Sequence, residues 1–483
     1  MQTKPLHPHP IAIVSYLSRA LYLLVFPFAR GLFLALRAGT LIAWAQGAWF
    51  DILVMLFIIG IAAIRWRLVE FWFDASGLYL KKGLFYSQTV FIPMRHICTL
   101  SAEYRLLLRP FRAVVLRADT PGGGTRHYDF ELIVRKRDAE QALAVRLDTC
   151  AKPHRAKRVL YPHSLHIAAL AAFLSNSFAG VVFAATALSR AGDIVGEKLQ
   201  GRALTLLTQV SESLSSFTYG VPPLAAMLGL VVLLGWFIGF VRNLLRLTRF
   251  RIARSGALLT IHSGLVTRRV YSVSADKVFY LDIRQSVMTR LLRIYLVFIR
   301  CAGYGKGGEA SVLIPSATRR DLANTLDGLL PGIRPHARAV KPTRGAWLRY
   351  LFPALMNFAA LFAGYGAAVT LLPAWRDIFR FALLAACFPL AWILAIKIVD
   401  YLTAGFSFEG GTLTLRYSRG FILHTVAVKP SHIAQIHIRQ SVFQRKSGSC
   451  DLIIHTHSEG KRPDAPHRVK SVPLNAVRQS LVS

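Results

Sequence analysis

The sequence is poor in the residues that enzymes and metal proteins place in clusters. Acidic residues number 24 against 59 lysines and arginines, and we find neither a carboxylate pair suited to general acid-base chemistry nor a nucleophile elbow. The cysteines are few, odd in number and without close pairs, which argues against a disulfide framework and a zinc knuckle. They are Cys98, Cys150, Cys301, Cys387 and Cys450. We therefore predict that the protein is not an enzyme and holds no cofactor or metal.

The chain also lacks the pattern of a nucleic-acid-binding protein, although its formal net charge is +35. Proteins that bind single strands interleave basic residues with stacking aromatic side chains on one surface. The sequence shows no clear case of this arrangement, so we expect no nucleic acid among the partners.

Apolar residues, in contrast, are abundant, at 54% of the chain against about 45–50% in typical soluble domains. They collect in blocks at 11–64, 164–188, 221–241 and 347–399. A membrane helix needs about 20 mostly apolar residues, and several blocks hold one or two such lengths. The last block breaks at Pro373, as a helical hairpin would. We predict an integral membrane protein with about six transmembrane helices in three pairs, of which the first helix, near Ile11 to Phe28, is the hardest to place.

The distribution of charge predicts the orientation of these helices. Basic residues outnumber acidic ones by 18 to 9 in 65–158, by 20 to 5 in 242–349 and by 12 to 5 from Lys397 to the end, whereas 189–220 sums to zero. Loops rich in Lys and Arg stay on the cytoplasmic side, most reliably near helix ends. We therefore expect a multi-pass protein of the bacterial inner membrane with its long segments and both termini in the cytoplasm. Attraction of these segments to anionic lipid headgroups is a further expectation.

The long basic segments are related by an internal repeat. Ile283-Arg284-Gln285-Ser286-Val287 recurs unchanged at Ile438-Arg439-Gln440-Ser441-Val442, and a fainter copy lies near Tyr104. Each segment opens with two short alternating runs around a glycine, which predicts a β-hairpin. An apolar strand follows, ending at Ile97, Val278 and Ile433 in the three copies. A glycine-rich turn closes each set, so we predict three β-rich modules.

This order of hairpin, apolar strand, Arg-Gln-Ser and glycine-rich turn resembles the bacterial pleckstrin-homology-like (PH-like) domain of the YdbT-like membrane protein family. Leu6-His-Pro-His-Pro-Ile11 and Leu160-Tyr-Pro-His-Ser-Leu165 resemble the motif that this family places before its membrane hairpins. The resemblance implies all-β modules, each a bent antiparallel sheet or partly open barrel closed by a C-terminal helix. Asp138 to Cys150 and Ala317 to Leu330 are candidates for that helix.

The resulting division alternates membrane hairpins with modules, the first module being divergent because it lacks Arg-Gln-Ser. The predicted transmembrane hairpins are 1–66, 159–245 and 345–400, and the predicted PH-like modules are 67–158, 246–335 and 401–483.

The candidate site residues are the two copies of the repeated motif, namely Arg284, Gln285, Ser286, Arg439, Gln440 and Ser441. Two interpretations remain open. A guanidinium and an amide at a strand end could hold loop carbonyls or a neighbouring module, or they could contact a lipid headgroup or a partner peptide.

Two other patterns were weighed as ligand sites and disfavoured. Residues 303–308, Gly-Tyr-Gly-Lys-Gly-Gly, lack the spacing of a phosphate-binding loop and predict a hairpin turn. Asp451, His455 and His457 share a strand face but have no further metal ligand that the sequence identifies.

The sequence thus predicts a scaffold that presents three modules for binding and assembly, with the lipid bilayer, a protein partner or self-association, and anionic headgroups as partners. Exposed sheet edges suit peptide addition, and three tethered modules would raise avidity. The alternative is a component of membrane transport or export, with the six helices forming the pathway. That alternative would require paired charges inside the spans, and the clear spans have almost none.

Overall fold

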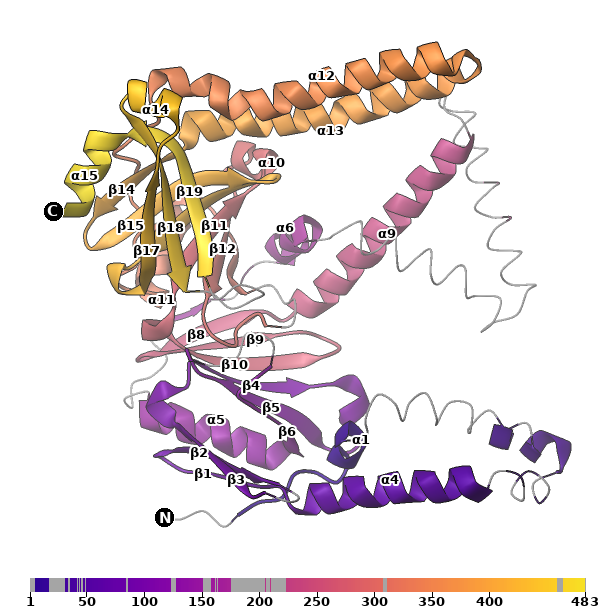
Figure 1. Ribbon diagram of the computed structural model, residues 1–483. Helices are drawn as coiled ribbons and strands as arrows, with labels where there is room; N and C mark the ends of the chain where they lie inside the picture. Colours follow the sequence, from indigo (N-terminus) through magenta and orange to yellow (C-terminus); the bar gives the residue numbers. More distant parts are fainter. Residues whose placement is uncertain are drawn as a thin grey trace.

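The computed structural model describes residues 5–16, 31–33, 35–40, 49–83, 86–122, 127–150, 158–160, 164–174, 223–306, 311–457 and 464–482, together with the single residues 42, 44, 47, 162, 205 and 209. Within them, three β-rich modules stack along one direction, and long helices leave the stack toward the same side (Figure 1). The glycine-rich turns are only partly described, because 123–126, 307–310 and 458–463 lie outside these residues.

The first module follows helix α4 and contains six strands and a closing helix. Its elements are α4 (Trp49–Arg67), β1 (Glu70–Phe73), β2 (Gly77–Lys82), β3 (Gln88–Pro93), β4 (Thr99–Tyr104), β5 (Ala113–Asp119), β6 (Phe130–Arg135) and α5 (Lys136–Cys150), with the short α1 (Ala12–Tyr16) preceding them. The closing helix predicted from Asp138 begins two residues earlier than expected.

The second module repeats this plan. Its elements are β7 (Arg158–Leu160), α6 (Ser164–Leu174), α9 (Pro223–Leu247), β8 (Arg251–Ser255), β9 (Leu258–Ser263), β10 (Arg268–Ser274), β11 (Tyr280–Gln285), α10 (Val287–Leu291), β12 (Tyr295–Arg300), β13 (Val312–Ala317) and α11 (Arg319–Leu329). The predicted helix near Leu330 is α11, and the Thr318 side chain caps it by accepting from the Asp321 amide.

The third module follows a long helical hairpin. Its elements are α12 (Trp347–Leu371), α13 (Arg376–Thr403), β14 (Gly405–Glu409), β15 (Thr412–Arg419), β16 (Ile422–Val428), β17 (Ile433–Arg439), α14 (Val442–Lys446), β18 (Ser449–His457), β19 (Asp464–Pro473) and α15 (Leu474–Val482). Gly410 and Gly411 join β14 to β15 with φ values of 58° and 67°. Two consecutive positive φ values are characteristic of a type I′ hairpin turn, and glycine adopts them without a Cβ clash.

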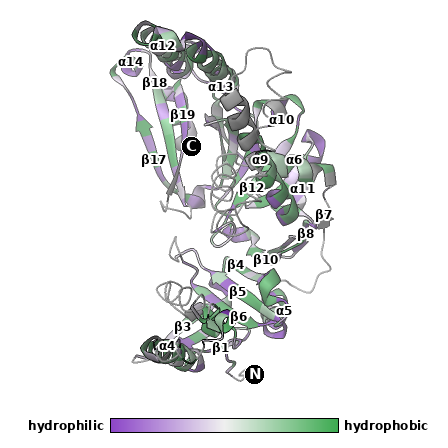
Figure 2. Cartoon of the chain, turned by 90° about the vertical axis from the view of Figure 1, so that its right-hand side faces the viewer, coloured by the Kyte–Doolittle hydropathy of each residue, from purple (hydrophilic) through white to green (hydrophobic). Residues whose placement is uncertain are grey.

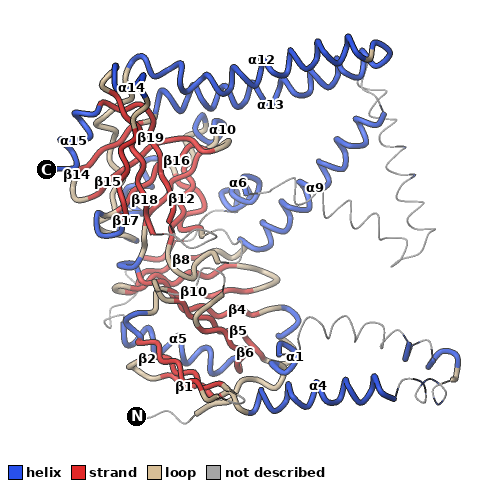
Figure 3. Tube along the Cα trace, viewed as in Figure 1, coloured by secondary structure: helices blue, strands red, loops and turns tan. Residues whose placement is uncertain are grey.

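Each module divides into an N-terminal and a C-terminal group of three strands, and neighbouring modules share sheets. One sheet has the order β6-β5-β4-β10-β9-β8-β7, and the next has the order β13-β12-β11-β16-β15-β14. The C-terminal strands of one module therefore continue into the N-terminal strands of the next. Two three-stranded sheets remain at the ends of the stack, β1-β2-β3 and β17-β18-β19 (Figure 3).

The lead-in segments before the modules reinforce the repeat. Leu6 bridges Phe71 of β1, β7 pairs with β8, and Val340 bridges Phe406 of β14. The two resembling motifs at Leu6 and Leu160 thus occupy comparable places, each beside the first strand of its module.

The hydrophobic core follows the shared sheets. One cluster fills the first module, including Phe71, Leu100 and Phe130, and a second runs through both later modules, including Leu281, Phe298 and Phe406. The second and third modules are therefore bound by a common core as well as by a common sheet.

Two of the described helical segments are long and apolar enough to cross a membrane, Arg344–Leu371 and Pro373–Thr403. They are the predicted last hairpin, and many of their large hydrophobic side chains are exposed. Figure 2 shows the hydropathy of the residues along α12 and α13. The prediction of six spans is not confirmed. Helices α4 and α9 form where two other spans were predicted. Residues 17–30 and 175–204, and all of 205–222 except 205 and 209, lie outside the described residues.

Candidate functional site: the module junctions

The first junction is an antiparallel pairing of β4 with β10. Thr99 lies opposite Val273, and the pairing continues to Tyr104 opposite Arg268. In β4, Leu100 and Ala102 are completely buried. Strand pairing supplies backbone hydrogen bonds, and burial of the apolar face supplies most of the remaining free energy.

The second junction pairs β11 with β16 in an equivalent register. Tyr280 lies opposite Val428, and Thr99 and Tyr280 each come two residues after the shared positions Ile97 and Val278. Val273 and Val428 each come five residues before the corresponding positions of their own modules. The two junctions therefore use the same strands of the repeat in the same alignment.

A buried ion pair holds the first junction. Lys306 Nζ lies 2.8 Å from Asp119 Oδ2, and their side chains are 5% and 1% exposed. Lys306 belongs to the glycine-rich turn of the second module, and Asp119 ends β5 of the first. Gly303 of this turn packs so closely on Asp119 that a Cβ there would lie 2.6 Å from the Asp119 Cβ. The predicted hairpin turn is thus also the part of the second module that docks on the first.

Glu103 forms a second bridge between the same modules. Its carboxylate lies 2.9 Å from Arg269 of β10 and 2.8 Å from Arg117 of β5. Burial raises the pKa of Glu103, but the neighbouring Arg269, Arg105 and Arg117 guanidinium groups outweigh it and lower the pKa below its ordinary value. The carboxylate therefore stays ionised and paired at neutral pH.

The second junction has a corresponding polar bridge. Asp282 Oδ1 lies 2.9 Å from Nδ1 of His424 on β16, and Asp282 Oδ2 lies 2.6 Å from Nε of Arg284. Burial alone would raise the pKa of Asp282. The hydrogen bond with His424 and the nearby His424 and Arg284 side chains outweigh burial and lower the pKa to about 2. The Arg284 guanidinium also lies over the Phe298 ring, 4.2 Å from its centroid.

The repeated Arg-Gln-Ser residues lie at the ends of β11 and β17, where each chain turns into a short helix. The Gln285 side-chain amide donates to the Ile294 carbonyl at 3.0 Å, and the Gln440 amide donates to the Ser449 carbonyl at 2.8 Å. Ser286 and Ser441 begin the short helices and accept hydrogen bonds from the backbone amides of Thr289 and Gln444. The glutamines and serines therefore close the same turn in both modules.

The two arginines of the motif differ in their surroundings. Arg284 lies within the second junction, whereas Arg439 ends the outermost strand of its sheet and is exposed. An interaction role for the six motif residues stays a prediction.

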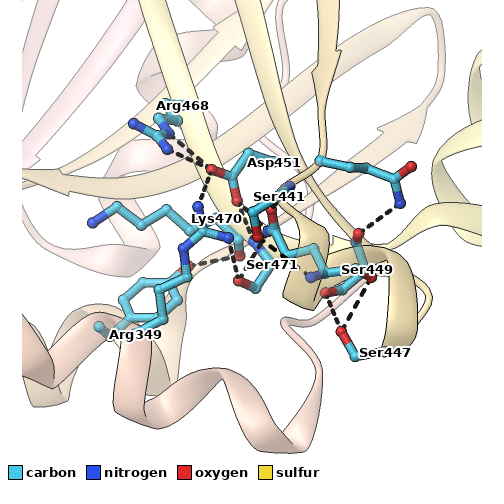
Figure 4. Close-up of polar contacts among 11 residues, drawn as sticks. Arg349, Ser441, Ser447, Ser449, Asp451, Arg468, Lys470 and Ser471 are labelled. Atoms are coloured by element: carbon cyan, nitrogen blue, oxygen red, sulfur yellow. Dashed lines mark hydrogen bonds and ion pairs between the residues drawn. The ribbon is translucent and has the colours of Figure 1, made fainter.

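Asp451 lies beside the third copy of the motif and connects the module to its membrane hairpin (Figure 4). Its completely buried side chain lies 2.9 Å from Arg349 of α12 and 2.5 Å from Arg468 of β19. The Gln444 side chain and the Ser471 amide also donate to it. Burial raises the pKa of Asp451, but the hydrogen bonds from Arg468, Ser471 and Gln444 lower it overall. Asp451 therefore accepts hydrogen bonds from these donors. The described residues contain no group of three or more His, Cys, Asp or Glu side chains that could hold a metal ion.

A pocket of about 810 Å³ lies between the first junction and α9. Its apolar wall comes from the C-terminal half of α9 and includes Phe237, Val241 and Leu245. Its other lining is strongly basic, with Glu103 as the acidic member. The basic lining residues are Arg105, Arg117, Arg242, Arg246, Arg269 and Lys306. An apolar wall that leads into a cluster of arginines matches the two parts of an anionic lipid.

Sequence reasoning found the motif but missed the residues that join the modules. Asp119, Glu103 and Asp282 could not be recognised in the sequence, because the partner that makes each of them a bridge belongs to another module. These partners are Lys306, Arg269 and His424. The available signal was the internal repeat, which aligns β4, β11 and β17 as equivalent strands. The repeat does not indicate which strand of another module pairs with each of them.

Comparison with known proteins places these features in a family. The model described as "Bacterial PH domain" matches residues 20–148, 203–329 and 354–479. The UPF0699 transmembrane protein YdbT of Bacillus subtilis (strain 168) is 20% identical over 381 residues, which cover 73% of this chain and 74% of that protein. No solved structure matches the chain.

Proposed function

Because the chain belongs to the bacterial PH domain family and is a membrane protein with repeated domains of this kind, we propose that it is a membrane scaffold that binds proteins by strand addition. The observation that carries the proposal is the pairing of β4 with β10 and of β11 with β16. In this chain, the modules bind one another through sheet edges, so an edge without a partner offers the same mode of binding.

The proposal includes an orientation. The scaffold lies in the inner membrane, with its modules and both termini in the cytoplasm, because the modules carry most of the excess positive charge. The last hairpin, α12 and α13, anchors it, and the Arg349–Asp451 contact couples that anchor to the third module.

Site-specific photo-crosslinking in cells tests the protein-binding role. A photoreactive amino acid replaces His437, which lies on the exposed strand β17. We expect covalent protein adducts of defined mass. The matched control replaces Phe421, an exposed residue of the same module in the turn between β15 and β16. The proposal is wrong if position 437 captures no protein, or captures the same mixture as position 421.

The basic pocket favours a second candidate function, binding of anionic lipid headgroups. Arg242 and Arg246 lie where the apolar part of α9 ends, which is where a spanning helix meets the headgroups. The double change of Arg242 and Arg246 to alanine is expected to reduce retention of phosphatidylglycerol relative to phosphatidylethanolamine in native mass spectrometry. Alanine at Arg376 and Arg380, at the start of α13, is the matched control. Equal relative retention of phosphatidylglycerol in both double variants would contradict lipid binding by this pocket.

The transport alternative gains no support from the described hairpin. Its Lys, Arg, Asp and Glu side chains lie within the first or last eight residues of α12 and α13, so the middle of each helix lacks them. Ion or polar-solute pathways in membranes are lined by such groups.

A further inference from the structure

The strand equivalent to those at both junctions is left without a partner at the end of the stack. β17 is the third-module counterpart of β4 and β11, and its sheet has the order β17-β18-β19. Among the described residues, no strand pairs with the outer edge of β17, which forms the margin of its module in Figure 2.

The exposed fractions of the apolar side chains of β17 show that this strand lacks a covering module. Leu281 and Ile283 of β11 are 0% and 4% exposed, whereas Ile436 and Ile438, at the same positions of β17, are 39% and 44% exposed. The apolar side chains are retained in the third repeat, but no following module covers them. A row of exposed isoleucines on an open strand edge is a surface that proteins normally cover.

The complementary edge lies at the other end of the same chain. β3 is the first-module counterpart of β10 and β16, and its sheet has the order β1-β2-β3. Phe91 of β3 is 47% exposed, whereas Ser272 of β10 at the equivalent position is 1% exposed. The chain therefore carries both halves of a third junction, at opposite ends of its stack.

We propose that β17 of one copy pairs with β3 of a second copy, in the register of the two internal junctions. This inference deepens the proposed function, on which it rests, by naming the partner. The shared register places Gln435 opposite Ile92, Ile436 opposite Phe91, and Ile438 opposite Thr89. Ile436 and Phe91 would then form a cross-strand pair of a β-branched and an aromatic side chain, which is among the favourable pairs in antiparallel sheets.

Such a contact is heterologous, because the two copies contribute different surfaces. It repeats with every added copy and ends in a closed ring or an open filament. The long helices α4, α9, α12 and α13 all leave the stack toward the same side (Figure 1), so copies joined end to end can share one membrane. Both internal junctions already show that this pairing is compatible with the helices.

Cysteine crosslinking between differently tagged copies tests the register. Cys150 and Cys387, the two cysteines that are not buried, are first replaced by serine. One full-length copy then carries Ile438→Cys and the other carries Thr89→Cys. Both are expressed together, and the isolated membranes are treated with copper(II)-phenanthroline and air, because thiols in the cytoplasm stay reduced and an oxidant is needed for disulfide formation. We expect a disulfide-linked product that contains both tags. The matched control pairs Ile438→Cys with Val90→Cys, which the proposed register places on the opposite face of the sheet.

Assembly state gives an independent measurement. Ile436→Lys with Ile438→Lys is expected to convert oligomers of the full chain to monomers in mild detergent, as measured by light scattering. The control, Phe421→Lys, changes an exposed hydrophobic residue of the same module and should leave the oligomers intact. Near-ultraviolet circular dichroism of each variant verifies that the modules remain folded.

The outcomes separate this inference from the proposed function. Crosslinking that is absent, or equal for Thr89 and Val90, overturns the self-pairing. If photo-crosslinks at position 437 then lead to another protein, the scaffold role stands with a different partner. If neither experiment captures a protein, both proposals fail.

Discussion

At the scale of residues, the junctions depend on a few buried charges whose partners come from distant parts of the chain. Asp119 and Lys306 are 187 positions apart and almost completely buried. Breaking a buried ion pair from one side leaves an uncompensated charge, whereas replacing both partners removes that cost. Such residues can be recognised as structural only when their partners are known.

Lys306→Ala is therefore expected to destabilise the first junction by about 3–5 kcal/mol. The readout is the midpoint of thermal unfolding of the purified chain, followed by limited proteolysis between the first two modules. The double variant Lys306→Met with Asp119→Asn should recover much of the loss. An unchanged midpoint in the single variant would show that the pair does not hold the junction.

His467 predicts a pH dependence for the third module. Burial lowers its pKa from 6.5 to about 4, and its ring nitrogens are hydrogen-bonded to the hydroxyl groups of Tyr417 and Thr456. Below pH 6.5 the unfolded chain binds a proton that the folded module does not. Stability is therefore present above pH 6.5 and lost as the pH falls toward 4, by about 3 kcal/mol in total.

The measurement compares denaturant unfolding at pH 7 and pH 4.5 in the natural protein and in His467→Gln, which keeps a hydrogen-bonding side chain. The natural protein should lose more stability on acidification than the variant. Parallel losses in the two proteins would assign the acid sensitivity to other groups.

At the scale of elements, the Arg-Gln-Ser motif closes the turn from the first strand of a C-terminal sheet into the next strand. Gln285 and Gln440 satisfy carbonyls at the far end of that turn, and Ser286 and Ser441 cap the short helices. The turn holds β11 and β17 in the position from which each presents its outer edge.

Gln285→Ala is accordingly expected to cost about 1–2 kcal/mol, since the Ile294 carbonyl loses its donor, and to increase hydrogen exchange of residues 286–295. Arg439→Ala, at an exposed position, should change stability by less than about 0.5 kcal/mol. If Gln285→Ala leaves hydrogen exchange of residues 286–295 unchanged, the motif does not stabilise the turn. A role of the motif in binding a partner is then favoured.

At the scale of the whole molecule, the chain is a row of modules in which sheets cross the module boundaries. Each boundary combines one continuous sheet with polar bridges, Asp119–Lys306 and Glu103–Arg269 at the first and Asp282–His424 at the second. The modules therefore cannot turn independently about their connections, and the helices on one side of the row are held in a common direction (Figure 1).

Orientation in the membrane is testable with single cysteines. Cys301 is buried and would resist labelling on either side, so new exposed positions are needed. Phe443→Cys, in α14, should resist an impermeant maleimide in spheroplasts and react in inverted vesicles. Leu371→Cys, at the connection of α12 and α13, should behave in the opposite way. The reverse pattern would place the modules outside the cytoplasm.

The sequence by itself determined the repeat, the strand and helix content of each module, and the last membrane hairpin. These depend on local patterns, namely alternation along strands, glycine at tight turns and long apolar runs, and each pattern is readable within a few dozen residues. The first two predicted hairpins remain only partly described, so the number of spans stays a prediction.

Only the tertiary structure decided how the modules are joined and which edges remain open. Strand edges pair through backbone groups that every residue carries, so β4, β11 and β17 look alike in sequence although two are buried at junctions and one is exposed. The bridging acids are likewise isolated in sequence and meet their partners only when two modules pack together. Local patterns thus specify the modules, whereas long-range packing specifies their order in space and the surfaces left for assembly.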